Sequence, residues 1–199
     1  MPALLCALGL VAAPAQAGRT ACHLLTDRKG DATQLYVAPD GTGPNDPALD
    51  IRSADVASNG KRITTALRVD AFAKSSDTSP LGYVWYVYFT IDGVELFTQA
   101  KTSPAGDEFS VGYVGAEGVR TALPSSAAKG AFTPDRDEIR VTFDAAQLAP
   151  VVKWKRGMRF ATLRALSNRS VGRAVLQADE GVNGKPYYDG TPSCVKPVG

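Results

Sequence analysis

The alternation of apolar and polar positions is clearest in residues 83–101. Two runs rich in aromatic and β-branched residues stand there, separated by the dipeptide Asp92-Gly93. An Asp-Gly pair favours a two-residue type I′ turn, because both central residues of that turn need a positive φ. The pattern therefore predicts a β-hairpin whose register follows by counting outward from the turn.

The predicted register divides the hairpin into two faces. One face pairs Ile91 with Val94, Phe89 with Leu96, Val87 with Thr98 and Trp85 with Ala100. The other face pairs Thr90 with Glu95, Tyr88 with Phe97, Tyr86 with Gln99 and Val84 with Lys101. Directly opposite residues share a face, so we expect the first, apolar set to lie in the core. The second set is expected to face outward with three aromatic rings.

Short alternating segments continue on both sides of the hairpin. Strands are expected near residues 24–26, 49–57, 63–69, 109–113, 119–123, 139–143 and 158–166. A change of inward parity between Ile51 and Ala54 predicts a β-bulge. Residues 144–150 are expected to form one or two helical turns with Asp144 as N-cap. Short strands punctuated by turns predict one all-β domain, an antiparallel β-sandwich.

Length and charge narrow the function classes. The 199 residues correspond to one domain, and the 22 basic and 20 acidic residues nearly balance. This balance gives no electrostatic reason to expect nucleic acid or an anionic membrane as an obligate partner. Residues 1–17 contain a short apolar run and end in a small-x-small motif, so we expect a signal peptide followed by a secreted domain over residues 18–199. No later stretch is apolar enough to span a membrane.

The cysteines fit the same interpretation. Removal of the leader takes away Cys6 and leaves Cys22 and Cys194 at opposite ends of the domain. In an exported protein a lone pair most simply forms a disulfide. Two free thiols or a metal pair are the alternatives, although a metal site needs more Cys or His ligands than this chain has.

Several short motifs resemble a known family. The segments DRKGDA (27–32), PALDI (47–51) and ADV (54–56) are similar to the N-terminal part of DOMON-like β-sandwiches, which are related to family 9 carbohydrate-binding modules. The segments ADE (178–180) and YDG (188–190) are similar to the closing part of such domains. The resemblance spans roughly residues 24–190 and implies a jelly-roll-like sandwich. Such domains include sugar binders and haem carriers, so the fold alone decides little about activity.

The resemblance implies two cofactor hypotheses. Some relatives hold a structural calcium near the first strand, and the matching carboxylates are Asp27, Asp31 and Asp50. Calcium takes six to eight oxygen ligands, which carboxylates and backbone carbonyls supply; the alternative is an ordinary Asx turn with solvated carboxylates. Haem-carrying relatives use a His and a Met, here His23 and Met158, although a core methionine is the more usual explanation.

Candidate ligand-binding residues lie on the outward face of the hairpin. Tyr86, Tyr88 and Phe97 offer flat apolar surfaces, and Glu95 and Gln99 offer hydrogen-bonding edges, which suits a sugar ring. The alternative is that cross-strand aromatic pairs only stabilise the sheet. With a single histidine and no nucleophile motif, we expect no enzyme. The sequence favours an exported carbohydrate-binding module, with a structural or protein-interaction module at the cell surface as the alternative.

Overall fold

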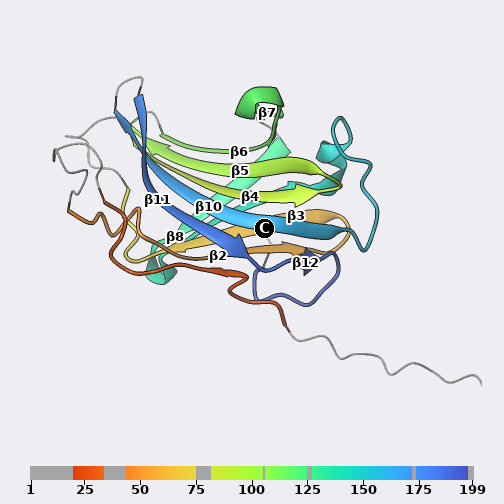
Figure 1. Cartoon of the computed structure of the whole chain (residues 1–199), viewed down its shortest axis with the longest axis horizontal. Coiled ribbons are helices and arrows are strands. Elements are labelled where there is room, and N and C mark those ends of the chain that lie inside the picture. Colours follow the sequence, from red (N-terminus) through yellow and green to blue (C-terminus); the bar gives the residue numbers. More distant parts are fainter. Residues whose placement is uncertain are drawn as a thin grey trace, which may run out of the picture.

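The computed structural model describes residues 20–33, 44–74, 82–104, 106–124, 127–171 and 174–196. Within these residues the chain forms two antiparallel β-sheets stacked in two layers (Figure 1). The protein is therefore an all-β sandwich, as the sequence predicts. The expected signal peptide, residues 1–17, lies outside the described residues.

The smaller sheet has five described strands in the order β1-β2-β3-β9-β8. Their bounds are β1 (Leu25–Thr26), β2 (Ile51–Ser58), β3 (Arg62–Val69), β8 (Ala128–Thr133) and β9 (Glu138–Asp144). The pairing of β2 with β3 shifts register between Ile51 and Ser53, which confirms the predicted bulge. Strand β8 has no counterpart among the strands expected from the sequence.

The larger sheet has seven described strands, with β11-β10-β4-β5-β6-β7 in line and β12 pairing with β10. Their bounds are β4 (Tyr83–Ile91), β5 (Val94–Ser103), β6 (Gly106–Val114), β7 (Arg120–Ala122), β10 (Arg159–Val171), β11 (Ala174–Gly184) and β12 (Tyr187–Tyr188). Short 3-10 turns, η1 (Ala116–Gly118), η3 (Pro134–Arg136) and η4 (Ala145–Leu148), join strands at the edges. Strand β11 was not expected from the sequence.

The central hairpin has the register that the sequence predicts. Asp92 and Gly93 both have positive φ, 51° and 79°, as a type I′ turn requires. All of the predicted cross-strand pairs, from Ile91 with Val94 out to Val84 with Lys101, are present between β4 and β5. The turn therefore decides which side chains of these strands enter the core.

The predicted helical turn is present, and Asp144 stands at its N-cap position. Asp144 precedes η4, but its side chain makes no cap hydrogen bond and the turn is 3-10 rather than α. Asp144 is the last residue of β9 and lies directly opposite Arg62 of β3. The two side chains form an ion pair with 3.7 Å between Arg62 Nε and Asp144 Oδ1. Cross-strand pairing thus takes the carboxylate away from the turn.

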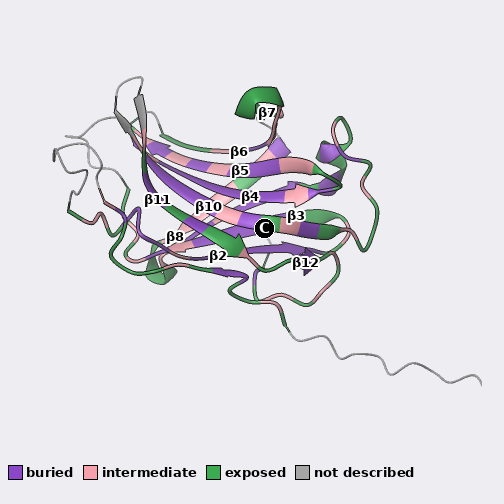
Figure 2. Cartoon of the chain, in the orientation of Figure 1, coloured by how far each residue is buried: buried purple, intermediate pink, exposed green. Residues whose placement is uncertain are grey.

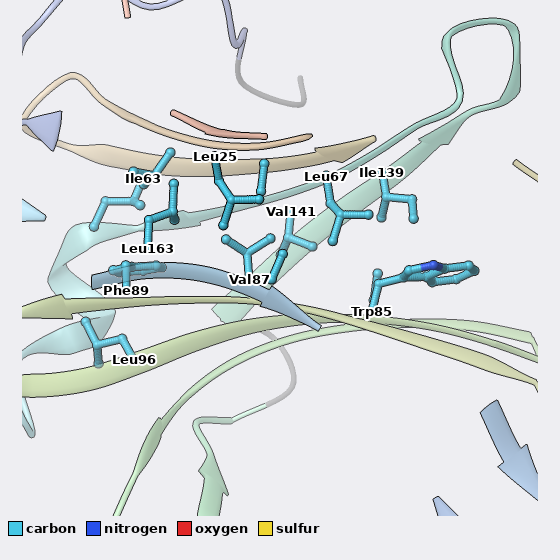
Figure 3. Packing of buried hydrophobic residues seen from close by; sticks show 14 of the residues in the cluster. Leu25, Ile63, Leu67, Trp85, Val87, Phe89, Leu96, Ile139, Val141 and Leu163 are labelled. Atoms are coloured by element: carbon cyan, nitrogen blue, oxygen red, sulfur yellow. The ribbon is translucent and has the colours of Figure 1, made fainter. Parts of the chain in front are cut away.

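Apolar side chains from both sheets fill the space between the layers (Figure 3). Trp85 and Phe89 are 1% and 0% exposed, as the register predicts. One buried polar contact also joins the layers, because the hydroxyls of Thr65 and Thr98 lie 2.7 Å apart. Each hydroxyl satisfies the other, so both tolerate the apolar surroundings.

A disulfide joins the first and last described segments of the domain. Cys22 and Cys194 form the predicted disulfide, with a sequence separation of 172. Beyond it, Val195 packs against Ala57 and Ala66 on the outside of the smaller sheet. Among the described helical segments, none has the length and apolarity to cross a lipid bilayer.

Candidate functional site

Carboxylates from distant parts of the chain meet near the start of β2 and the middle of β11. One oxygen from each of Asp31, Asp50 and Asp179 lies within 4.8 Å of the others. Asp27 lies close to this group, because its charge raises the pKa of Asp179. The structure therefore brings together the three carboxylates predicted from the sequence and adds Asp179.

Asp50 is the most buried member of this acidic cluster. Its side chain is fully buried, and its Oδ2 accepts hydrogen bonds from the Gly30 amide at 2.6 Å and from Asn45 Nδ2 at 3.0 Å. Its Oδ1 is also buried but has no hydrogen-bond partner among the described residues, and the same holds for Asn45 Oδ1. A buried carboxylate oxygen without a partner costs free energy. The alternative of solvated carboxylates in an Asx turn does not describe Asp50.

Asp179 and Asp27 are held by backbone amides. Asp179 Oδ2 accepts from the Ile51 amide at 2.7 Å, and its Oδ1 accepts from the Glu180 amide at 2.7 Å. Asp27 Oδ1 accepts from the Arg28 amide at 2.9 Å. The other oxygen of Asp27, Oδ2, is buried and unpaired within the described part of the chain.

The negatively charged carboxylates of the cluster repel one another. Burial raises the pKa of Asp179 to about 6, and the charges of Asp27 and Asp31 add to this effect against the lowering by the Ile51 amide. Burial also raises the pKa of Asp27, and the charges of Asp31 and Asp50 act in the same direction. The charge of Arg52 lowers the pKa of Asp27, but it offsets only part of this rise.

This donor set fits a calcium ion. It offers carboxylate and amide oxygens only, which are the ligands that calcium prefers, and it contains none of the His or Cys donors typical of zinc. Asp31 is exposed, so the cluster opens to solvent on that side. Asp27, Asp31, Asn45, Asp50 and Asp179 are the residues that would hold the ion. Sequence reasoning missed Asn45 and Asp179, although Asp179 stands in one of the motifs that carry the family resemblance.

The prediction of three open aromatic rings is wrong. Tyr86, Tyr88 and Phe97 do lie together on the outer face of β4 and β5, but they are only 6%, 0% and 3% exposed. The Arg120 guanidinium carbon lies 4.6 Å from the ring centre of Tyr86, and that of Arg164 lies 3.7 Å from the ring centre of Tyr88. Long arginine side chains from neighbouring strands cover aromatic faces by cation–π contact. Figure 2 accordingly shows β4 as largely buried.

The polar residues predicted beside these rings are engaged within the protein. Glu95 Oε1 accepts from Nε and Nη2 of Arg164 at 3.1 and 3.0 Å. Gln99 donates to the Tyr86 hydroxyl at 2.8 Å and accepts from Ser110 at 2.9 Å. Glu95, Gln99 and the Tyr86 hydroxyl are therefore paired within the protein, and this face offers no free ring for stacking.

The two residues of the haem hypothesis have separate surroundings. His23 is exposed next to Cys22, and Met158 is partly buried against the core. The Met158 sulfur accepts a contact from the Lys155 amide at 3.2 Å. No contact between His23 and Met158 is present in the described residues, so the structure adds no support to this hypothesis.

Fold and site together define a class, a two-layer β-sandwich with an oxygen-donor cluster that suits a divalent cation. Comparison of the sequence with models of known protein families finds no match, and comparison with curated proteins finds none either. The function must therefore be argued from the residues themselves.

Proposed function

We propose that this chain is a non-catalytic binding module of the exported type, which is stabilised by a bound calcium ion and takes carbohydrate as its ligand. The observation that carries the calcium proposal is the fully buried Asp50. Its Oδ1 lacks a partner in the described chain, and one of its carboxylate oxygens lies within 4.8 Å of oxygens of Asp31 and Asp179. A divalent cation brings positive charge to these carboxylates.

The proposed role of the ion is structural. It would join the turn after β1, the start of β2 and the strand β11, which belong to different sheets. A ligand that binds only the folded state stabilises it, by about 2.7 kcal/mol at a hundredfold excess over Kd. The ion supplies charge neutralisation and cross-linking, and the chain's own backbone amides keep the carboxylates oriented.

Calcium titration tests this part of the proposal. We expect the melting temperature to rise with Ca²⁺ and to fall when EDTA is added, with a smaller effect of Mg²⁺, which demands stricter octahedral geometry. Isothermal titration calorimetry should give a stoichiometry of one. Identical melting curves in Ca²⁺ and in EDTA, together with no heat of binding, would contradict the proposal.

Carbohydrate is proposed as the ligand from the family resemblance. The disulfide between Cys22 and Cys194 is compatible with an oxidising, exported environment. The buried rings of Tyr86 and Tyr88 are no longer the proposed contact surface. Binding to a panel of neutral and acidic glycans tests the ligand class. Capture of a protein partner in place of any glycan would favour the alternative of a protein-interaction module.

A further inference from the structure

A hollow of about 440 Å³ lies where β10 begins and β11 ends. Its walls combine polar and apolar side chains, among them Arg159, Thr162, Val182 and Asn183. The end of β11 is coloured as exposed in Figure 2, and Val182 alone is 50% exposed. The volume is within the usual range of small-molecule sites.

The hollow is formed by an interruption of the sheet. The pairing of β10 with β4 shifts register between Ala161 and Arg164, and its pairing with β11 shifts between Leu163 and Ala165. Thr162, inside the first shift, has a φ of 46°. Left-handed backbone is strained for a β-branched residue and is retained mainly where function needs it.

The wall of the hollow formed by β11 also contains a residue with left-handed backbone. Asn183 of β11 has a φ of 62°, and the next residue, Gly184, is the direct partner of Leu163. A Cβ on Gly184 would lie 2.7 Å from the Leu163 carbonyl oxygen, so only glycine allows this close approach. Two left-handed residues therefore stand on adjacent strands and line one opening. Bulges of this kind often redirect side chains at binding sites.

The charge in the hollow is concentrated on one side chain. Arg164 is neutralised, because it donates to Glu95 and lies 3.5 Å from Glu180. The Arg159 side chain is exposed and makes no hydrogen bond or ion pair with another described residue. Arg159 is thus a cation available to a ligand. A free guanidinium binds a carboxylate with two parallel hydrogen bonds.

An exposed aromatic ring stands next to this cation. Tyr188 of β12 is the direct cross-strand partner of Arg159 and is 52% exposed. Directly opposite residues of an antiparallel pair project from the same face. The opening therefore presents a guanidinium, the amide of Asn183 and an apolar wall, and the Tyr188 ring lies beside it on the same face as Arg159.

From this arrangement we infer that the hollow binds a saccharide carrying a carboxylate, such as a uronic acid unit. Arg159 pairs with the carboxylate, and Tyr188 stacks on the apolar face of the sugar ring. Asn183 supplies hydrogen bonds to the sugar hydroxyls, whereas the Thr162 hydroxyl is engaged with that of Thr90. The inference rests on the carbohydrate part of the proposed function and is independent of the calcium site.

The test uses the full domain in the presence of Ca²⁺ and isothermal titration calorimetry. The probes are a hyaluronan tetrasaccharide, which carries glucuronate, the neutral chitotetraose, and acetate as a bare carboxylate. We expect the hyaluronan tetrasaccharide to bind at least tenfold more tightly than either comparison probe. Arg159→Gln and Tyr188→Ala should each weaken that binding at least tenfold. Arg136→Gln, at another exposed arginine in η3, should leave it unchanged.

Each contrary result has a distinct meaning. Equal binding of both tetrasaccharides, unaffected by Arg159→Gln, overturns the acidic-sugar inference but keeps carbohydrate as the ligand. Acetate binding as tightly as the hyaluronan tetrasaccharide overturns it in favour of a simple anion site. Failure of every glycan to bind overturns both the inference and the carbohydrate part of the proposed function. Retained melting temperatures in the variants show that any loss of binding is local.

Discussion

The carboxylate of Asp179 accepts a hydrogen bond from the backbone amide of Ile51 at 2.7 Å, across 128 residues of sequence. Ile51 directly follows Asp50, so this bond places the two carboxylates side by side. It also joins β11 of the larger sheet to β2 of the smaller sheet at one edge of the sandwich. The hydrogen bond that brings Asp179 next to Asp50 therefore also holds the two layers together.

Replacing Asp50 with Asn should change stability in opposite directions with and without calcium. In EDTA we expect Asp50→Asn to raise the melting temperature, because it removes a buried charge that faces Asp31 and Asp179. In Ca²⁺ we expect the variant to lose most of the calcium-induced rise, because it removes a charged ligand. Differential scanning calorimetry in the two buffers measures both effects.

The control for this experiment is Asp92→Asn. Asp92 is exposed at the hairpin turn with a φ of 51°, and Asn tolerates left-handed backbone. We expect it to leave the response to calcium unchanged. If Asp50→Asn responds to calcium as fully as the wild type, Asp50 is not a ligand.

The acidic cluster also predicts a pH dependence. The pKa of Asp179 is raised to about 6 from an ordinary value of 3.8, chiefly by burial. A carboxyl whose pKa is raised by folding stabilises the folded state at low pH, and this contribution is lost as the pH rises through the raised value. In EDTA, the wild type should therefore lose stability relative to Asp179→Asn as the pH increases from about 4 to about 7.

Urea denaturation at several pH values measures this difference. Calcium should bind less tightly as the pH falls through about 6, because the ion competes with the proton for the carboxylate. A stability difference between wild type and Asp179→Asn that stays constant over this range would show that Asp179 does not titrate as described.

The two tyrosines of the outer face should respond differently to loss of the hydroxyl. The Tyr88 hydroxyl is buried and has no hydrogen-bond partner among the described residues. We expect Tyr88→Phe to be neutral or slightly stabilising, because removal of an unsatisfied group relieves its desolvation. The Tyr86 hydroxyl accepts from Gln99 at 2.8 Å, so Tyr86→Phe should cost about 1 kcal/mol in the free energy of unfolding.

Denaturation in urea at neutral pH compares these matched variants. Each variant keeps its aromatic ring, so the cation–π contacts with Arg120 and Arg164 are retained in both. A larger loss of stability in Tyr88→Phe than in Tyr86→Phe is the result that would contradict the assignment of hydrogen bonds on this face.

The disulfide should stabilise the domain mainly through the unfolded chain. A cross-link that closes a ring of this length lowers the entropy of the unfolded state, with an upper estimate of about 5 kcal/mol. We expect Cys22→Ser, Cys194→Ser and the double variant to lose similar amounts. Reduction of the wild type should reach the same stability, and a double variant as stable as the oxidised protein would contradict this role.

Local patterns of residues are sufficient to predict the central strands. Asp92 and Gly93 are adjacent and favour one turn geometry, so counting outward predicts which side chains of β4 and β5 enter the core. The bulge in β2 and the grouping of Asp27 with Asp31 likewise depend on residues close in sequence. The alternation of apolar residues supports the all-β class for the same reason.

The cover of the outer face and the completion of the acidic cluster depend on how distant strands pack together. Arg120 and Arg164 come from β7 and β10 and bury rings that alternation alone assigns to solvent. Asp179 reaches Asp50 through a strand, β11, whose position depends on pairing with β10. Alternation reports the face of a strand but carries no information about which distant side chains will lie upon it, because that depends on how the strands are ordered in space.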